Sequence, residues 1–282
     1  MTEPRSFKLR KIPVGMIMLL ALGLAAAIGP LFIDFNPASA DTSSRLLAPF
    51  SHNRAGAFFL LGTDQLGRGM LEQIVHGART SLLIGVSAAL IAGLAGTLIG
   101  VMAGWLGGRS ETLIMRIADI QLSFPSILIA VFLAAFVPPS IIAVILVLAA
   151  TRWAQIARLA RAVTVKARQQ SYVEAALTLG FPVPKIIWSC ILPNLIAPLI
   201  IVLTAELSLI ILAESALGYL GLGTPPTIPS WGRIIANGKN YLDNAWWIST
   251  LPGLAIALVV IAIGLTGDWM RRYFARSGWE VT

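Results

Sequence analysis

The chain has 282 residues, of which 57% are hydrophobic and only 12% are charged. The charged fraction is about half that of an ordinary soluble domain, so the composition excludes a soluble globular protein and indicates a membrane protein. The net charge of +8 does not indicate nucleic acid as a partner, because the basic residues stand in short segments between apolar blocks.

The sequence contains no pattern for a cofactor, a metal ion or a catalytic group. The single cysteine, Cys190, excludes an internal disulfide, and His52 and His76 lack metal-ligand spacing. Residues 238–240 come nearest to a phosphate-binding loop, but they lack the upstream glycine and the following Ser or Thr. We therefore expect no cofactor, no metal and no catalytic residue, and we expect any energy source to lie on another polypeptide.

The first region, residues 1–33, reads as a basic cytoplasmic tail followed by a transmembrane helix. The apolar run over residues 12–33 exceeds the roughly 20 helical residues that a bilayer requires. A cleaved signal peptide is the alternative, since Ala38-Ser39-Ala40 resembles a cleavage site. The hydrophobic region of a signal peptide is usually only about 7–15 residues, which favours an uncleaved first helix.

The second region, residues 34–79, is polar and irregular at first and reads as an external loop. Thr63 and Asp64 then resemble a helix cap, and apolar residues follow at helical spacing. Two interpretations are open for this helix. It could lie on the outer leaflet as an interfacial helix, or it could pack as an ordinary amphipathic helix.

The third region, residues 80–270, is predicted to be a five-helix core, and residues 271–282 are predicted to be a cytoplasmic tail. The expected spans are residues 81–105, a span from about 117 that is kinked at Pro125, and residues 141–153, 195–217 and 248–265. An external loop, residues 218–247, precedes the last span, and its Trp246-Trp247 pair suits the aromatic belt of a membrane.

Small residues recur every four positions along the second span, including Gly96, Gly100 and Gly104. This spacing places them on one helix face, where a second helix can approach closely. The pattern indicates helix packing rather than a catalytic loop.

Charge distribution predicts the orientation of the six spans. Six of the 21 lysines and arginines fall on the side opposite the N-terminus, namely Arg45, Arg54, Arg68, Arg79, Arg233 and Lys239, and the remaining fifteen fall on the N-terminal side. By the positive-inside rule, both termini are cytoplasmic. The expected location is the cytoplasmic membrane, as a multi-pass protein.

Residues 160–193 form the longest predicted cytoplasmic segment, and its part from Ser171 to Pro193 is too polar to span a bilayer. We expect a short helix that Gly180 ends in the left-handed conformation, then a second helix with Pro184 in its first turn. On the first helix, Glu174 offers a charge for register, and the small Ala175 and Ala176 allow a partner to come close. The alternative is that these are ordinary helices of a cytoplasmic loop.

The pattern Glu174-Ala175-Ala176, Gly180 and Leu192-Pro193 resembles the signature loop of ABC-importer permeases, with Cys190 where that family usually has isoleucine. The resemblance implies an all-α fold with six transmembrane helices and a type I permease core. It also implies a coupling helix that docks on an ATPase subunit. The residues it implicates in ATPase coupling are Tyr172, Glu174, Ala175, Ala176, Gly180, Pro184, Leu192 and Pro193.

Two further segments, residues 60–85 and 213–232, look like segments of the second permease of dipeptide, oligopeptide and nickel importers, although Gly69 replaces the usual Asp. This resemblance implies a non-catalytic subunit that carries a peptide-like solute by alternating access, with nickel, a metal chelate or an opine as alternative cargo. The implied partners are a second homologous permease, two ATPase subunits inside, a substrate-binding protein outside, and the lipid bilayer.

Glu206 is the strongest candidate for the translocation path, because a carboxylate at membrane depth costs several kcal/mol unless it is paired or faces water. Glu214 lies eight residues further along the same span, where a structural role is the better interpretation. Asp119 and Gln121 are expected to cap or pair near the cytoplasm. An ion-coupled secondary transporter is the rival class, but it would need ionisable pairs and usually internal repeats.

Overall fold

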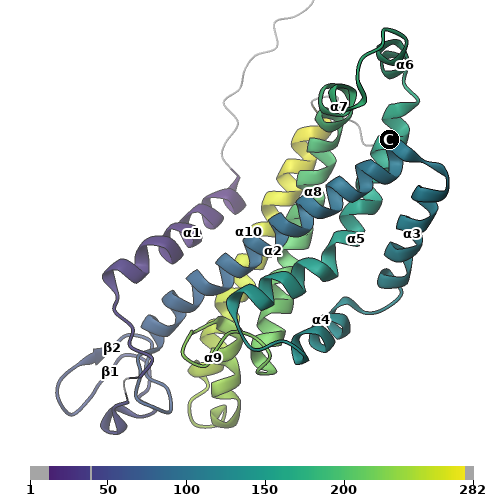
Figure 1. Cartoon of the computed structure of the whole chain (residues 1–282). Coiled ribbons are helices and arrows are strands. Elements are labelled where there is room, and N and C mark those ends of the chain that lie inside the picture. Colours follow the sequence, from purple (N-terminus) through teal and green to yellow (C-terminus); the bar gives the residue numbers. More distant parts are fainter. Residues whose placement is uncertain (1–12, 39, 277–282) are drawn as a thin grey trace, which may run out of the picture.

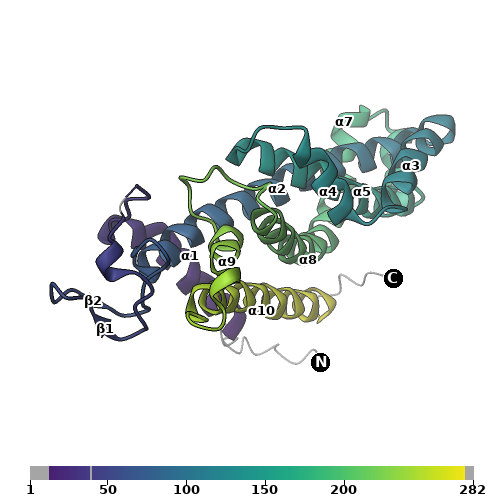
Figure 2. The same ribbon diagram turned by 90° about the horizontal axis from the view of Figure 1, so that it is seen from below.

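The computed structural model describes residues 13–38 and 40–276, so the basic residues before position 12 lie outside the described part. Long helices run between two ends of a bundle (Figure 1). One end carries the short helices of the predicted cytoplasmic loop, and the other carries the predicted external segments. Figure 2 shows α2 crossing the bundle, with α1 and α10 towards one side and α3, α4 and α5 towards the other.

Helix α1 (Val14–Phe32) follows Pro13 and matches the first predicted span closely. A short 3₁₀ turn, η1 (Thr42–Ser44), and a two-stranded antiparallel hairpin follow, with strands β1 (Ser51–His52) and β2 (Phe58–Phe59). This hairpin is a small departure from the expected all-α fold. We refer to residues 34–69 as the extracytoplasmic module, after the side of the membrane on which the sequence predicts them.

Helix α2 (Met70–Leu106) is one continuous helix of 37 residues. The prediction of a separate interfacial helix before the second span was therefore wrong, and the alternative of a packing helix fits better, since Met70 is fully buried. Thr63 and Asp64 do not cap this helix, whose N-cap is Gly69. Instead, Asp64 accepts hydrogen bonds from the backbone of Leu66 and Arg68 in the preceding turn.

The third predicted span is not one kinked helix. Helix α3 (Gly108–Leu122) and helix α4 (Ser126–Ala135) meet at an angle of 87° across residues 123–125. Pro125 lacks a backbone N–H and disfavours the helical conformation for the preceding Phe124, so the α3 hydrogen-bond ladder cannot continue through it. The pair is a broken span or a re-entrant segment, and α3 begins nine residues earlier than the predicted span.

Helix α5 (Ile141–Arg168) begins at Ser140, whose hydroxyl accepts from the Ala143 N–H at 3.1 Å. It continues well past residue 153, the predicted end of the fourth span. The basic run from Arg152 to Arg168 is therefore the cytoplasmic half of a helix and not a loop. The predicted span ends too early because charged residues mark the limit of the membrane and not the end of the helix.

Helix α6 (Ser171–Thr178) and helix α7 (Val183–Ile186) form the two predicted short helices. A π-helical turn, η2 (Ile187–Ile191), joins α7 directly to helix α8 (Leu192–Tyr219). The fifth span therefore begins as part of one helical unit from residue 183, not as a separate helix at residue 195. Pro193 cannot donate a backbone hydrogen bond, which explains a local change of helix type just before it.

Helix α9 (Trp231–Gly238) and the 3₁₀ turn η3 (Lys239–Tyr241) give structure to the external segment before helix α10 (Trp247–Arg276). Trp246 is half exposed, but Trp247 is buried and donates its indole N–H to the Thr63 carbonyl at 3.1 Å. Trp247 is thus a packing residue that joins α10 to the extracytoplasmic module. Its assignment to the aromatic belt was wrong.

Among the described residues, five helical units are long and apolar enough to cross a membrane, and there are six if the broken pair of α3 and α4 is counted as one span. Two apolar clusters hold the bundle together. In the first, Ile84, Leu148 and Ile210 join α2, α5 and α8; in the second, Met70, Trp231 and Ile248 join α2, α9 and α10. Helix α2 belongs to both clusters and is the central element of the fold.

Candidate functional site

The end of the bundle that is predicted to be cytoplasmic presents α6 and α7 beyond the ends of the long helices (Figure 1). Helix α5 leads into α6 through a turn at residues 169 and 170. Arg168, the last residue of α5, donates to the Trp105 carbonyl at 2.6 Å and lies over the Trp105 ring, 5.4 Å from its centroid. This contact fixes the end of α5 against the end of α2 next to α6.

Gly180 ends α6 with φ of +74°, the left-handed conformation that the sequence predicts. The N–H of Gly180 donates to the Leu177 carbonyl, and the N–H of Phe181 donates to the Ala176 carbonyl, at 3.0 and 3.1 Å. These two bonds are those of a Schellman motif, which satisfies carbonyls that the helix end leaves free. A Cβ at position 180 would meet no atom within 4 Å, so only the backbone conformation restricts this position to glycine.

Helix α6 rests on the bundle through Val173 and Ala176, which pack with Ile186 against Trp105 and Cys190. Ala176 is 6% exposed, so it faces the interior of this chain rather than a partner. The expectation that both alanines receive a partner was therefore half wrong, since only Ala175 is exposed. Cys190 is a packing residue, as expected.

Tyr172 lies at the border of this contact. The residue is 45% exposed, and its hydroxyl accepts a hydrogen bond from the Asn194 side chain at 3.1 Å. The same amide donates to the Cys190 carbonyl at 2.6 Å. Asn194 thus ties α6 to the first turn of α8, a role that a lone asparagine after a proline did not reveal in the sequence.

The outward face of α6 combines one carboxylate with apolar side chains. Glu174 and Ala175 are exposed, Leu179 is 73% exposed, and Leu177 and Phe181 are more than 40% exposed. Exposed apolar side chains on the water-facing side of a membrane protein indicate contact with another protein. Leu177 and Phe181 were not singled out from the sequence, although unpaired apolar residues in a cytoplasmic loop are a usable signal.

The remaining residues of the signature anchor this face rather than extend it. Pro184 lies in the first turn of α7, as predicted, and Lys185 lies 4.3 Å from the centroid of the Phe181 ring. Leu192 packs into an apolar cluster with Val101 and Ala160, and Pro193 lies in the first turn of α8.

Gly96, Gly100 and Gly104, which we call the glycine face, lie against α5. A Cβ at Gly96 would approach the Trp153 carbonyl oxygen to 2.6 Å, and one at Gly104 would approach the Arg161 carbonyl oxygen to 2.8 Å. A Cβ at Gly100 would meet the backbone of Ala157. The two helices are therefore in backbone contact along three turns, and no larger residue fits between them.

Glu206 lies on α8, 5% exposed, and its carboxylate meets Arg152 of α5 with an Nη1–Oε2 distance of 3.5 Å. The side chains are 7% and 12% exposed, so this is a buried ion pair. The Nε of Arg152 is buried with no hydrogen-bond partner. The sequence identified Glu206 but placed Arg152 in a cytoplasmic loop, so the pairing was missed.

Two ion pairs, one exposed and one partly buried, join α3 to α5. Arg158 contacts Asp119 at 2.6 Å, and Arg161 contacts Glu111. Gln121 donates to the Ala150 carbonyl at 2.9 Å. Asp119 and Gln121 therefore each have a partner on α5, as predicted. These pairs hold α3 beside α5 although Pro125 breaks the span below it.

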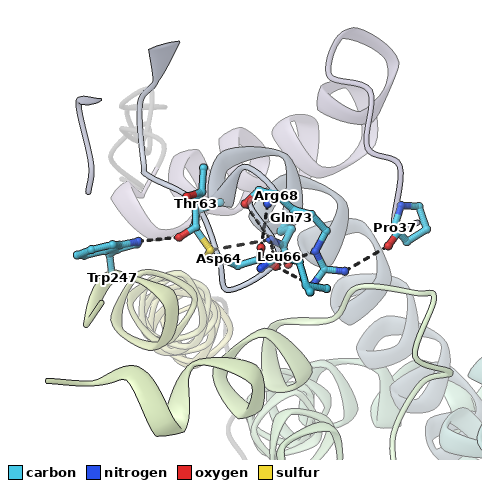
Figure 3. A network of polar contacts seen from close by, with 8 residues as sticks. Pro37, Thr63, Asp64, Leu66, Arg68, Gln73 and Trp247 are labelled. Atoms are coloured by element: carbon cyan, nitrogen blue, oxygen red, sulfur yellow. Dashed lines mark hydrogen bonds and ion pairs between the residues drawn. The ribbon is translucent and has the colours of Figure 1, made fainter. Parts of the chain in front are cut away.

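The extracytoplasmic module is fixed on the bundle by a polar network (Figure 3). One oxygen of Asp64 accepts from the Arg68 Nε at 2.7 Å and from the Gln73 amide at 3.0 Å. Arg68 also donates to the Pro37 carbonyl at 3.3 Å, and Trp247 donates to Thr63. Asp64 is 1% exposed, so this network connects the module rigidly to α2 and α10.

Comparison with known proteins agrees with this architecture. Residues 96–278 match the family described as the binding-protein-dependent transport system inner membrane component. The chain is 40% identical over 258 residues to the di/tripeptide transport system permease protein DppC of Pseudomonas aeruginosa, covering 91% of this chain and 85% of that one. It is 39% identical over 259 residues to the dipeptide transport system permease protein DppC of Escherichia coli, covering 92% and 86%.

Among solved structures, the chain is similar to the MetNI methionine ABC transporter, with a TM-score of 0.57 and 19% identity over 72% of this chain and 97% of that chain. This likeness concerns the fold alone. Together with the six potential spans and the family match, it places the protein in the cytoplasmic membrane as a multi-pass subunit. The chain belongs to the family of inner membrane components of binding-protein-dependent transport systems, with the fold of an ABC-importer permease.

Proposed function

We propose that this chain is one permease subunit of an ATP-driven importer of di- or oligopeptides, paired with a second homologous permease in a heterodimer. Two ATPase subunits bind on the cytoplasmic side, and a substrate-binding protein delivers the solute outside. The permease itself is non-catalytic and works by alternating access. The peptide assignment is supported by the names of relatives that match over more than nine-tenths of the chain.

The observation that carries the docking role is the outward face of α6. It lies beyond the bundle, it combines the exposed Glu174 with apolar side chains, and its other side is fixed to α2 and α8. Because α6 is fixed to α2 and α8, a movement of an ATPase subunit bound to α6 is transmitted to these long helices. We assign ATPase contact to Glu174, Ala175, Leu179 and the rim of Tyr172, and the positioning of α6 to Ala176, Gly180, Pro184, Leu192 and Pro193.

Two substitutions test this assignment. Glu174→Lys reverses the exposed charge, and Gly180→Val forces a β-branched residue into the left-handed region, which costs about 1–2 kcal/mol and shifts the end of α6. Both variants should insert and assemble but lose peptide uptake and the stimulation of ATP hydrolysis by the binding protein. Radiolabelled dipeptide uptake and ATPase assays on the purified complex measure these effects.

Matched controls are available on the same side of the membrane. Asp268→Lys reverses an exposed charge on α10, and Gly108→Val places valine at another glycine of positive φ, +57°, where a Cβ also meets nothing within 4 Å. Both controls should keep coupled transport. Normal uptake in Glu174→Lys and Gly180→Val together would refute docking through α6.

We also propose that Glu206 and Arg152 face the translocation path during the transport cycle. The pair lies midway along α8 and joins it to α5, so a relative movement of these helices would expose both charges. A carboxylate and a guanidinium are the groups that bind the two charged ends of a peptide. Glu206→Gln should then raise the KM for dipeptide uptake more than it changes the ATPase rate without substrate, and an unchanged KM would exclude this role.

The substrate class is tested separately with the binding protein. Its melting temperature should rise with di- and tripeptides and not with nickel or free amino acids. If nickel alone raises the melting temperature, nickel and not a peptide is the cargo. This result would leave the coupling role of α6 unaffected.

A further inference from the structure

Helix α1 contacts the bundle along its length, most tightly at its two ends, and one face of its middle turn stays open. Near the cytoplasmic end, a Cβ at Gly15 would approach the Leu265 Cβ of α10 to 2.7 Å. Near the outer end, a Cβ at Gly29 would approach Val75 of α2 to 2.6 Å. Between them, Leu22 packs against the second apolar cluster and Ala26 is buried, but a Cβ at Gly23 would meet no atom within 4 Å, so this face of α1 is open.

The space under the middle of α1 is an open groove of about 640 Å³ between α1, α2, α8 and α10, which we call the α1 groove. Its walls are almost entirely leucine, isoleucine, valine and alanine side chains, and Gly23 lies on its α1 side. A volume of this size is within the range of about 300–1,000 Å³ that is typical of ligand sites. The groove lies at the level of the membrane, so water is a poor occupant.

Two polar residues of α2 line the groove, Arg79 and Ser87. No charged residue follows Arg79 on α2 over residues 80–108, so Arg79 marks the outer border of the apolar segment. It lies one turn further into the membrane than Val75, the residue that contacts the outer end of α1. An arginine at this depth extends its head towards the lipid headgroups.

Arg79 is exposed, and among residues 13–38 and 40–276 no carboxylate or other side chain bonds to it. A guanidinium at the membrane border without a protein counter-ion attracts phosphate, to which it can donate two parallel hydrogen bonds. From Arg79 to Ser87 the groove follows α2 for about 12 Å, within the roughly 15 Å depth of one leaflet. The length of the groove, the positive charge of Arg79 and the apolar lining therefore all fit one lipid molecule of the outer leaflet.

We propose that the α1 groove binds a phospholipid of the outer leaflet, with the phosphate on Arg79 and an acyl chain between α1 and the bundle. The lipid fills the open side of α1 at Gly23 and adds to the contacts that Leu22 and Ala26 make with the bundle. Only 11% of the most apolar window of α1 is buried within this chain, against 33–44% in the other four long units, so α1 depends most on such contacts.

Photo-crosslinking tests the proposal on the complete complex. The probe is phosphatidylglycerol with a diazirine on one acyl chain, mixed with phosphatidylethanolamine in the vesicles that hold the complex. Labelled peptides should map to residues 19–27 and 82–87 in the wild type. Gly23→Leu should abolish this labelling without disturbing the fold, because the new side chain enters open space.

Arg79→Gln should reduce the labelling about ten-fold or more, as the loss of a charged hydrogen bond implies, and Arg79→Lys should restore most of it. Arg54→Gln, an exposed arginine of the extracytoplasmic module, is the matched control and should have no effect. Native mass spectrometry should show one retained phospholipid that Gly23→Leu releases. Equal labelling in the wild type, Arg79→Gln and Gly23→Leu would overturn the proposal.

Discussion

Replacing Glu206 with glutamine should destabilise the permease by about 3 kcal/mol, because Arg152 then remains as a buried charge without its counter-ion. The two side chains are 7% and 12% exposed, and their atoms are 3.5 Å apart. At this distance two unit charges attract by about 5 kcal/mol when the effective dielectric constant is about 20. We use the low end of the range of about 3–5 kcal/mol for breaking buried pairs, because the contact is long.

The free energy of unfolding can be measured by SDS titration of the purified complex in mixed micelles, followed by tryptophan fluorescence. The double variant Arg152→Gln with Glu206→Gln should recover much of the loss, since no unpaired charge remains buried. Asp119→Asn is the matched control: its partner is Arg158, both side chains are 53% exposed, and it should cost no more than about 1 kcal/mol. Equal effects of Glu206→Gln and Asp119→Asn, or strict additivity in the double variant, would refute the buried-pair reasoning.

Three further predictions concern packing and the outer surface. Gly100→Leu should prevent stable assembly, because the new side chain would force α2 away from α5. Gly264→Leu should be tolerated, since a Cβ there meets nothing within 4 Å. Gel filtration of the purified complex compares the two variants. Trp247→Phe removes the indole N–H bond to Thr63 and should lower the free energy of unfolding by about 1 kcal/mol, with faster proteolysis of residues 34–69 as the readout. Hydrogen bonds from two serine hydroxyls lower the pKa of Asp41 below its ordinary value of 3.8. The charged form of Asp41 therefore stabilises the module above pH 3.8, and this contribution is lost as the pH falls through the lowered pKa. Asp41→Asn should remove the corresponding pH dependence of proteolysis.

The sequence predicted the family and the approximate position of five spans, because a motif and an apolar length are properties of single segments. It also predicted the left-handed Gly180 and the position of Pro184, since both follow from local backbone chemistry. These features do not depend on which helix lies next to which.

Helix limits and side-chain partners could not be predicted in the same way. The polar border at Arg152 was read as the end of a span, although the helix continues to Arg168, because charge reports the position of the membrane and not of the hydrogen-bond ladder. The break at Pro125 looked like a kink, and its 87° angle is a property of the packed bundle. Pairs such as Glu206 with Arg152 join residues 54 positions apart, which a single sequence does not reveal.

Within the proposed coupling surface, the family pattern did not separate the residues that face outward from those that support the helix. Ala176 and Leu192 are turned into the chain, while Leu177 and Phe181 face outward. A helix of eight residues has too few positions for its periodicity to define the buried side, and the π turn before Pro193 rotates the following helix.

The uninterrupted length of α2 makes it suitable as an optical reporter of the transport cycle. Its 37 residues extend for about 55 Å, from Trp105 beside α6 to Met70 beneath the extracytoplasmic module. A helix this long curves only gently, and its backbone contact with α5 prevents local bending, so a tilt at one end must reach the other. A fluorophore on the hairpin outside, for example at the exposed Arg54, should therefore change its distance to the binding protein each time ATP is hydrolysed inside.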